Sequence, residues 1–120
     1  DMYDHEEYIK QNKRQSKGRW RLPKIEELLS LVDYTTHNPA SIADITSRHY
    51  WSSTIYTSYT RYAWYVDFYY GNSSSNHKTC NYYVRSIRDT DNGLEWGEDA
   101  PSRMSWHKAM EYAEGLNDEN

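Results

Sequence analysis

Cysteine is almost missing from this chain: Cys80 is the only one among 120 residues. A lone cysteine cannot form a disulfide within the chain, so the fold does not depend on an oxidising compartment. Long apolar runs are missing too. No stretch is long enough to cross a bilayer or to form the apolar part of a signal peptide. The sequence therefore predicts no membrane insertion.

Basic residues are fewer than acidic residues in this chain. Lys and Arg number 14 against 18 Asp and Glu, which leaves a net charge of -4. Nonspecific binding of DNA or RNA depends on basic side chains that displace counterions from phosphates. We therefore expect no nucleic acid partner.

The sequence patterns of catalytic and metal sites are also missing. The five histidines are scattered without metal-ligand spacing, and no serine lies in a Gly-x-Ser-x-Gly turn. The run Asp89-x-Asp91-Asn92-Gly93 starts like a calcium loop, but Ala100 stands where the loop needs a bidentate glutamate. We interpret the run as a turn before a strand. The sequence thus predicts no enzyme, no bound metal and no cofactor.

Aromatic residues, by contrast, are abundant, with 13 Tyr and 5 Trp in a chain that is only 37% hydrophobic. The length suits one domain. Large aromatic side chains supply apolar area that the aliphatic residues do not. We therefore expect one core that is built largely from aromatic residues.

Two helices are expected in the first third of the chain. Residues 4–15 form a polar helix candidate with Asp4 as its cap. The second helix is expected from Pro23, because Pro suits a first helical position and two glutamates follow in the first turn. Its apolar residues repeat at helical spacing: Ile25, Leu28, Leu29 and Val32. Residues 35–47 read as an irregular connection.

Strands are expected at 49–55, 61–69 and 82–88, where Tyr, Trp, Val, Ile and Thr are frequent. Residues 71–76 read as a polar turn between the last two. In the middle strand, alternation places Trp64, Val66 and Phe68 on one face, which we expect to point inward. The other face carries Tyr65, Asp67 and Tyr69, which we expect to point outward.

The last third predicts a turn and short strand at 91–96 and a helix at 105–116. Ser105 is the expected N-cap and Gly115 lies near the helix end. The apolar stripe of this helix consists of Trp106, Ala109, Met110 and Ala113. We expect this stripe to pack onto the rest of the fold.

Three motifs resemble a known family. They are GRWRLPKIEELLSLV at 18–32, YWSST at 50–54 and YYVRSIR at 82–88. Their order and spacing are similar to those of the C-terminal domain of the Legionella collagen-like protein, a bacterial family grouped with C-type-lectin-like folds. The resemblance implies an α+β, C-type-lectin-like fold with a small antiparallel sheet, one or two packed helices and long irregular loops. Residues 1–120 would form one such domain.

The chain departs from this family in two respects. A similar turn-strand and helix normally precede the Trp-Arg-Leu-Pro motif, whereas here they follow it at 89–120. Residues 89–120 are therefore either a permuted part of the domain or the start of a second tandem copy. The resemblance also implies a disulfide between the positions of Ser86 and Ala113. The family suggests a secreted or cell-surface protein, and the loss of both cysteines makes a cytoplasmic or phage-encoded protein the alternative.

The motif residues themselves are expected to be structural. We expect Trp20 and Leu22 to wedge the helix start into the core, and Arg21 to pair with a nearby carboxylate.

A ligand-binding site is expected on the tyrosine-rich residues between the motifs. Rigid aromatic side chains with short polar groups are typical of binding surfaces. The candidate ligand-binding residues are Tyr56, Tyr59, Arg61, Tyr62, Tyr65, Asp67, Tyr69, Asn72, His77, Lys78, Asn81 and Tyr83. The alternative to a binding role is a structural one: Tyr is a good strand former, and its hydroxyl keeps an exposed sheet soluble.

The resemblance implies noncatalytic recognition of a glycan or protein ligand, as in an adhesin, by a homo-oligomer that is a trimer in the family. The chain lacks the Glu-Pro-Asn and Trp-Asn-Asp signatures of calcium-dependent lectins, so we expect calcium-independent binding. Two alternatives are an intracellular or phage-encoded inhibitor that acts by protein-protein binding, and a structural trimerisation unit without a ligand.

Overall fold

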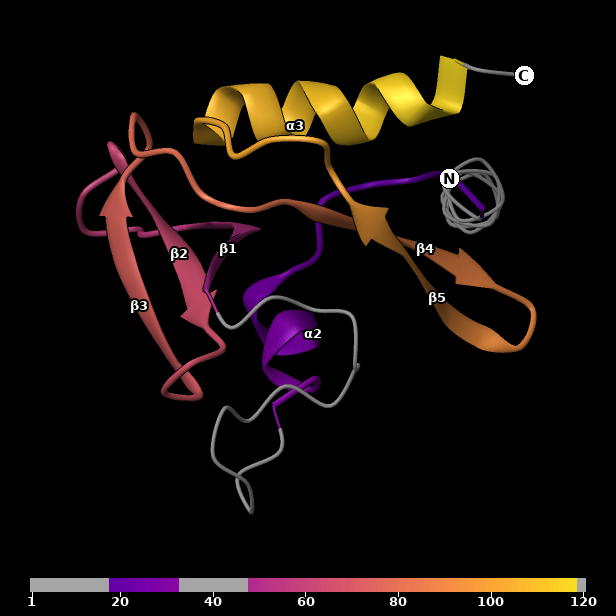
Figure 1. Cartoon of the computed structure of the whole chain (residues 1–120), viewed down its shortest axis with the longest axis horizontal. Coiled ribbons are helices and arrows are strands. Elements are labelled where there is room, and N and C mark those ends of the chain that lie inside the picture. Colours follow the sequence, from indigo (N-terminus) through magenta and orange to yellow (C-terminus); the bar gives the residue numbers. More distant parts are fainter. Residues whose placement is uncertain (1–17, 33–47, 119–120) are drawn as a thin grey trace, which may run out of the picture.

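The computed structural model describes residues 18–32 and 48–118, and these ranges have an α+β fold (Figure 1). The expected helix at 4–15 and the irregular connection at 35–47 lie outside the described residues. No helix in the described ranges is long and apolar enough to span a membrane. The elements are, in order, α2 (Ile25–Leu29), β1 (His49–Ile55), β2 (Tyr62–Asp67), β3 (Asn72–His77), β4 (Arg85–Thr90), β5 (Gly93–Asp99), α3 (Trp106–Gly115) and the 3-10 turn η1 (Leu116–Asp118).

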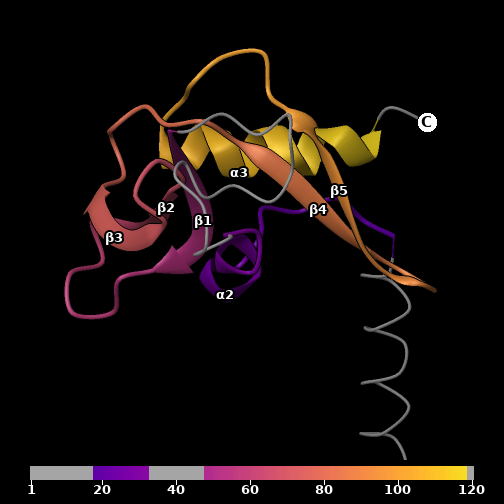
Figure 2. The same cartoon turned by 60° about the horizontal axis from the view of Figure 1, so that its bottom comes forward.

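The strands form two small antiparallel sheets, one of order β1-β2-β3 and one made by the β4-β5 hairpin. Helix α2 contacts all three strands of the first sheet, and α3 contacts β1. In Figure 1, α3 extends above both sheets and α2 lies below, between them. Figure 2 shows α2 next to β1. The two helices therefore approach the first sheet from different sides.

Strand β1 has the predicted bounds, whereas β2 is shorter than the predicted strand at 61–69. The chain turns after Asp67, whose carboxylate oxygen Oδ1 accepts the backbone N–H of Tyr69 at 2.9 Å. The backbone N–H of Gly71 donates to the carbonyl of Asp67 at 2.7 Å. Gly71 has a φ of 74°, a conformation that favours glycine. Asp67 thus ends β2 by stabilising the turn that follows it.

The prediction of a turn at 71–76 is wrong, because residues 72–77 form strand β3. This strand pairs with β2 along its whole length, from Asn72 opposite Asp67 to His77 opposite Tyr62. Its sequence, NSSSNH, contains no β-branched residue and no Tyr, Trp or Phe, so its side chains alone favour a turn. The strand forms because pairing depends on backbone groups, which β2 supplies.

The predicted strand at 82–88 is wrong in its first part. Tyr82 and Tyr83 form isolated bridges to Met104 and Tyr50, and β4 begins only at Arg85. Each tyrosine pairs with a different segment, so no two consecutive residues form the continuous backbone pairing of a strand. The predicted turn and strand after Asp91 are confirmed by β5.

The core consists of two clusters that cover opposite faces of the first sheet. Along β2, Ala63 and Tyr65 contact one cluster, and Trp64 and Val66 contact the other. The buried members of the first cluster are Leu22, Trp51, Ala63, Val84, Ala100, Trp106 and Ala109. Those of the second are Ile25, Leu28, Leu31, Tyr50, Val66 and Phe68.

This arrangement corrects the expectation of one core. Val66 and Phe68 do point toward α2, as alternation predicts, but a second cluster, which includes Trp51 and Val84, lies on the opposite face. Trp64 is only half-buried. The physical reason is that α3 covers the face that was expected to be open, through Trp106 and its neighbours.

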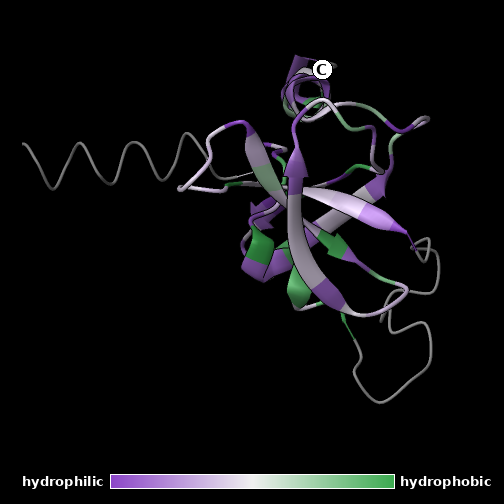
Figure 3. Cartoon of the chain, turned by 90° about the vertical axis from the view of Figure 1, so that its left-hand side faces the viewer, coloured by the Kyte–Doolittle hydropathy of each residue, from purple (hydrophilic) through white to green (hydrophobic). Residues whose placement is uncertain are grey.

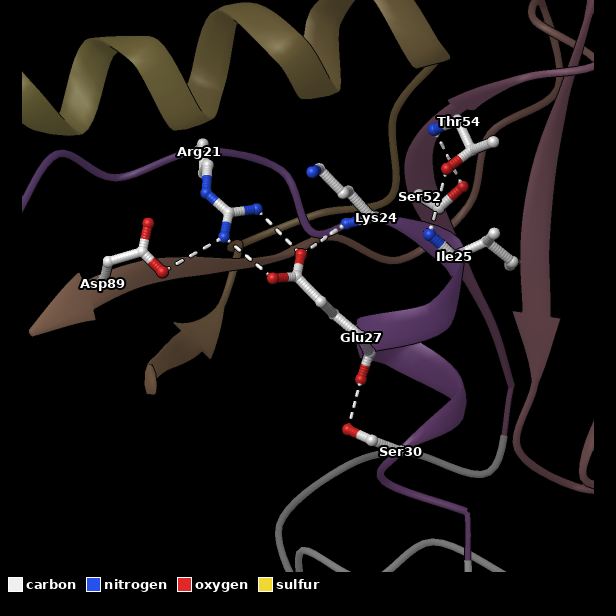
Figure 4. Close-up of polar contacts among 8 residues, drawn as sticks. All are labelled: Arg21, Lys24, Ile25, Glu27, Ser30, Ser52, Thr54 and Asp89. Carbon is white, nitrogen blue, oxygen red and sulfur yellow. Dashed lines mark hydrogen bonds and ion pairs between the residues drawn. The ribbon is translucent and has the colours of Figure 1, made fainter. Parts of the chain in front are cut away.

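Arg21 pairs with a carboxylate, as the sequence predicts (Figure 4). Its Nη1 and Nη2 lie 2.8 Å from the two oxygens of Glu27. Nη2 also lies 3.5 Å from Oδ1 of Asp89 in β4. The same Glu27 accepts the backbone N–H of Lys24 at 2.8 Å, which satisfies one of the free donors at the helix start. The motif therefore links α2 to the β4-β5 hairpin.

Helix α2 starts two residues later than predicted. Pro23 lies before the helix rather than at its first position, and Ile25 is the first helical residue. The N–H of Ile25 donates to Oγ1 of Thr54 at 3.0 Å (Figure 4), and the carbonyl of Pro23 accepts the N–H of Ser53 at 2.7 Å. The helix start is thus held on β1.

Helix α3 begins after Ser105, as predicted. Trp106, Ala109 and Ala113 are buried, and the indole N–H of Trp106 donates to the carbonyl of Ser52 at 2.8 Å. The expectation that Met110 packs inward is wrong, because its side chain is 38% exposed. Trp106, Ala109 and Ala113 lie along the buried side of the helix, and Met110 lies beside that side.

Candidate functional site

The twelve candidate residues do not form one surface. Strand β2 has six residues, so its two ends lie roughly 17 Å apart. Tyr62 begins the strand and Asp67 ends it, and candidates gather at both ends. At the Tyr62 end lie Tyr56, Tyr59, Arg61, Tyr62, His77 and Lys78. At the Asp67 end or next to it lie Asp67, Tyr69, Asn72, Asn81 and Tyr83, and Tyr65 lies between the two groups.

Four rings at the Tyr62 end form what we call the tyrosine cluster: Tyr56, Tyr59, Tyr62 and His77. The rings of Tyr56 and Tyr59 are parallel, with centroids 5.9 Å apart and planes 1° apart. Tyr62 lies 6.0 Å from Tyr59 and 4.4 Å from the His77 imidazole. Tyr59 is 66% exposed and His77 is also exposed, whereas Tyr56 and Tyr62 are half-buried, so the cluster reaches the solvent mainly through Tyr59 and His77.

Backbone hydrogen bonds hold the loop that carries this cluster. The backbone N–H of Tyr56 donates to the carbonyl of Tyr62 at 3.0 Å. The N–H of Tyr59 donates to the carbonyl of Tyr56 at 3.1 Å, and the N–H of Tyr62 donates to the carbonyl of Tyr59 at 2.9 Å. His77 is held opposite Tyr62 by the pairing of β2 and β3. A surface that is already ordered loses less entropy when it binds a ligand.

A surface hollow of about 440 Å³ opens beside these rings. It is lined by Ser58, Tyr59, Thr60, Arg61, Tyr62 and His77. A second hollow of about 210 Å³ adjoins it and is lined by Tyr56, Tyr59, Tyr62 and Ser75. The larger volume lies within the range of small-ligand pockets, and its lining combines aromatic faces with hydroxyl, guanidinium and imidazole groups. Such a lining can stack on a ligand and form hydrogen bonds to it.

Lys78 belongs to the framework next to this cluster. Its ammonium lies 4.4 Å from the ring centroid of Trp106, and its carbonyl accepts the N–H of Trp106 at 2.9 Å. This contact stabilises the start of α3.

The expectation that Tyr65 points outward is wrong. Its ring is half-buried between His49 at 4.7 Å and Tyr82 at 4.8 Å, with Trp51 at 6.4 Å. Asp67 is also not outward: it is 9% exposed, and its carboxylate contacts His49 at 3.2 Å as well as the turn at Tyr69. Tyr65 and Asp67 therefore stabilise the fold through packing and hydrogen bonds, because the face of the sheet that carries them is covered.

The Asp67 end carries two further hollows, each smaller than the one of about 440 Å³, that share Arg48 and His49. One of about 270 Å³ is completed by Asn81, Tyr82, Tyr83 and Arg103. The other of about 280 Å³ is completed by Asp67, Tyr69 and Tyr70. Asn72 is exposed at the start of β3. Arg48, Tyr70, Tyr82 and Arg103 were not among the predicted residues, because they come from separate segments that only the fold brings together.

Tyr82 and Tyr83 are held by packing. Burial raises the pKa of the Tyr82 hydroxyl, which accepts a hydrogen bond from Asn76 at 2.8 Å. Tyr83 stacks on Tyr50 at 5.5 Å. In the described ranges, no group of three or more His, Cys, Asp or Glu side chains is placed to hold a metal ion.

Comparison with known proteins supports the sequence motifs. No curated protein and no solved structure matches this chain, so the C-type-lectin-like arrangement stays a prediction. The family model of the Lcl C-terminal domain matches residues 1–88, which is most of the chain and includes all three motifs. The chain therefore belongs to the Lcl C-terminal domain family.

Proposed function

We propose that this protein is a noncatalytic recognition domain that binds a glycan or protein ligand through the tyrosine cluster. Arg61, Ser58 and Thr60 supply polar groups around the rings. An adhesin-like role follows from this proposal, since a bacterial binding domain with such a surface suits attachment. Membership of the Lcl C-terminal domain family is compatible with this proposal.

One observation carries the proposal: three tyrosine rings and an imidazole meet at the Tyr62 end of the first sheet, beside a hollow of about 440 Å³. Exposed aromatic residues in contact with one another are costly to leave in water, and binding sites concentrate them. The size of the hollow suits one or two sugar units or one protruding side chain better than a flat protein surface.

A glycan array followed by calorimetry on the best ligand tests this proposal, with Tyr59→Ser as the key variant. Removing an aromatic anchor at a binding site typically costs about 2 kcal/mol, so we expect roughly thirtyfold weaker binding. The matched control is Tyr70→Ser. Tyr70 is an equally exposed tyrosine, at 73%, but it lies at the other end of β2.

Equal loss of affinity in both variants would show that tyrosine content, rather than this cluster, matters. Unchanged binding in Tyr59→Ser would place the site elsewhere. If the ligand is a protein, we expect no binding on the glycan array. The protein should then bind a partner in a capture assay, and that binding should be lost in Tyr59→Ser. We also expect binding to persist in EDTA, because the proposed contacts are aromatic rings and hydrogen-bonding side chains.

A further inference from the structure

Strand β3 is the outer edge of the first sheet. The other edge is covered, because Tyr83 accepts the N–H of Trp51 at 3.1 Å and donates its own N–H to His49 at 3.0 Å. In Figure 1, β3 lies at the left margin, and Figure 3, which looks at that side, shows it in front. No other described element pairs with its outer side.

The hydrogen-bond pattern shows which residues of β3 face outward. Lys78 donates its N–H to Arg61 across the β2-β3 pair at 2.9 Å. Backbone groups alternate along an antiparallel strand, so Asn72, Ser74 and Asn76 face β2. The backbone groups of Ser73, Ser75 and His77 therefore face away from the sheet.

Two of these three residues are free to pair. The N–H of His77 donates to the Asn76 side chain at 2.8 Å, and its carbonyl accepts the N–H of Cys80 at 3.0 Å. No partner is recorded for the backbone N–H and carbonyl groups of Ser73 and Ser75 within the described part of the chain. The edge thus offers two donors and two acceptors.

The usual devices that protect a sheet edge are missing from β3. The strand has no proline and no formally charged residue, and its pairing with β2 has no bulge. The whole chain carries a net charge of -4, which opposes self-association through most of its surface. Because β3 itself is uncharged, its contact with an identical strand adds no like-charge pair.

From these observations we propose that β3 pairs antiparallel with β3 of a second copy, with Ser74 on the twofold axis. Hydrogen-bonded pairs in such a ladder must join outward-facing residues. With Ser74 on the axis, Ser73 of each copy faces Ser75 of the other, and all four free groups per copy are used. A register centred on Ser75 would require the His77 groups, which are already bonded. This inference does not rest on the proposed ligand site, although Ser75 and His77 of β3 also line its hollows.

Analytical ultracentrifugation of the protein over a range of concentrations tests the dimer, with Ser75→Pro as the disrupting variant. Proline removes the outward N–H without touching the bonds to β2. By symmetry two interchain hydrogen bonds are lost, so we expect dimerisation at least about tenfold weaker. The matched control is Ser75→Val, which keeps the N–H and should dimerise as the parent does.

A cysteine scan in a Cys80→Ser background tests the register even if Ser75→Pro does not fold. Opposite residues in a non-hydrogen-bonded antiparallel pair have Cα atoms about 4.5 Å apart, within disulfide range. We expect Ser74→Cys to form disulfide-linked dimers on mild oxidation and Ser73→Cys not to. Faster linkage by Ser75→Cys would overturn the register. A protein that stays monomeric at its highest soluble concentration, with no linkage by any variant, would overturn the proposal.

Discussion

Arg21 and Glu27 form a two-bond ion pair, with Nη1 2.8 Å from Oε1 and Nη2 2.8 Å from Oε2. The Arg21 hydrogen bonds lower the pKa of the Glu27 carboxyl below its ordinary value of 4.5. A carboxyl whose folded pKa lies below its unfolded pKa stabilises the fold above the unfolded value. That stabilisation is lost as the pH falls through the lower, folded value.

We therefore expect Glu27→Gln to lower the free energy of unfolding by about 1 kcal/mol at neutral pH, a modest figure because both side chains are partly exposed. The difference from the parent should shrink toward zero in acid, as Glu27 becomes protonated. Chemical denaturation at about pH 7 and about pH 3 measures this. Glu26→Gln is the control, since Glu26 is an exposed first-turn neighbour and should change little at either pH.

Trp106 should be the anchor of α3. Its indole is 6% exposed and donates to Ser52 at 2.8 Å, so Trp106→Phe leaves a buried carbonyl without its donor. We expect a loss of about 1 to 3 kcal/mol in unfolding free energy. Met110→Ala, on the exposed side of the same helix, should cost well under half of that. Equal losses measured by thermal denaturation would contradict this placement.

The chain after β5 should be needed for the fold. We infer that residues 89–118 complete this domain rather than begin a second copy, because Trp106 and Ala109 are buried with residues of β1 and β2. A variant that ends at residue 99 should expose this cluster and become less stable or aggregate. Melting temperature and light scattering measure the outcome. A truncated protein as stable and monomeric as the parent would support the tandem-copy alternative.

Tyr65 should matter for stability more than for binding. Its ring lies between His49, Trp51 and Tyr82, so Tyr65→Ser removes buried aromatic contacts. We expect a cost of about 2 kcal/mol and a lower melting temperature. Tyr59→Ser should leave the melting temperature nearly unchanged, because Tyr59 is mostly exposed. The opposite order would contradict the assignment of Tyr59 to the surface.

Ser86 carries a buried hydroxyl that has no hydrogen-bond partner. An unsatisfied buried polar group is costly, so Ser86→Ala should leave stability unchanged or raise it by up to about 1 kcal/mol. Ser52 is the control, because its hydroxyl is buried but donates to the carbonyl of Trp64 at 2.7 Å. Ser52→Ala should therefore destabilise. Urea titration of both variants measures the contrast.

Local patterns in the sequence predicted what depends on neighbouring residues. The bounds of β1, the start of α3 after Ser105 and the pairing of Arg21 with a carboxylate are all confirmed. The three motifs also indicated the family, which the match to residues 1–88 confirms. These features are encoded over a few residues, through β-propensity, helical periodicity and charge.

Tertiary structure decided the features that depend on distant segments. Alternation in β2 separates two faces, but it does not tell what covers each one, and α3 turns the face of Trp51 and Tyr65 into core. Strand β3 forms because β2 supplies its backbone hydrogen-bond partners. Its Ser and Asn side chains do not predict a strand. The candidate residues were divided between the two ends of β2 for the same reason: a sequence records which side chains are available, whereas packing across long separations decides which of them stay exposed.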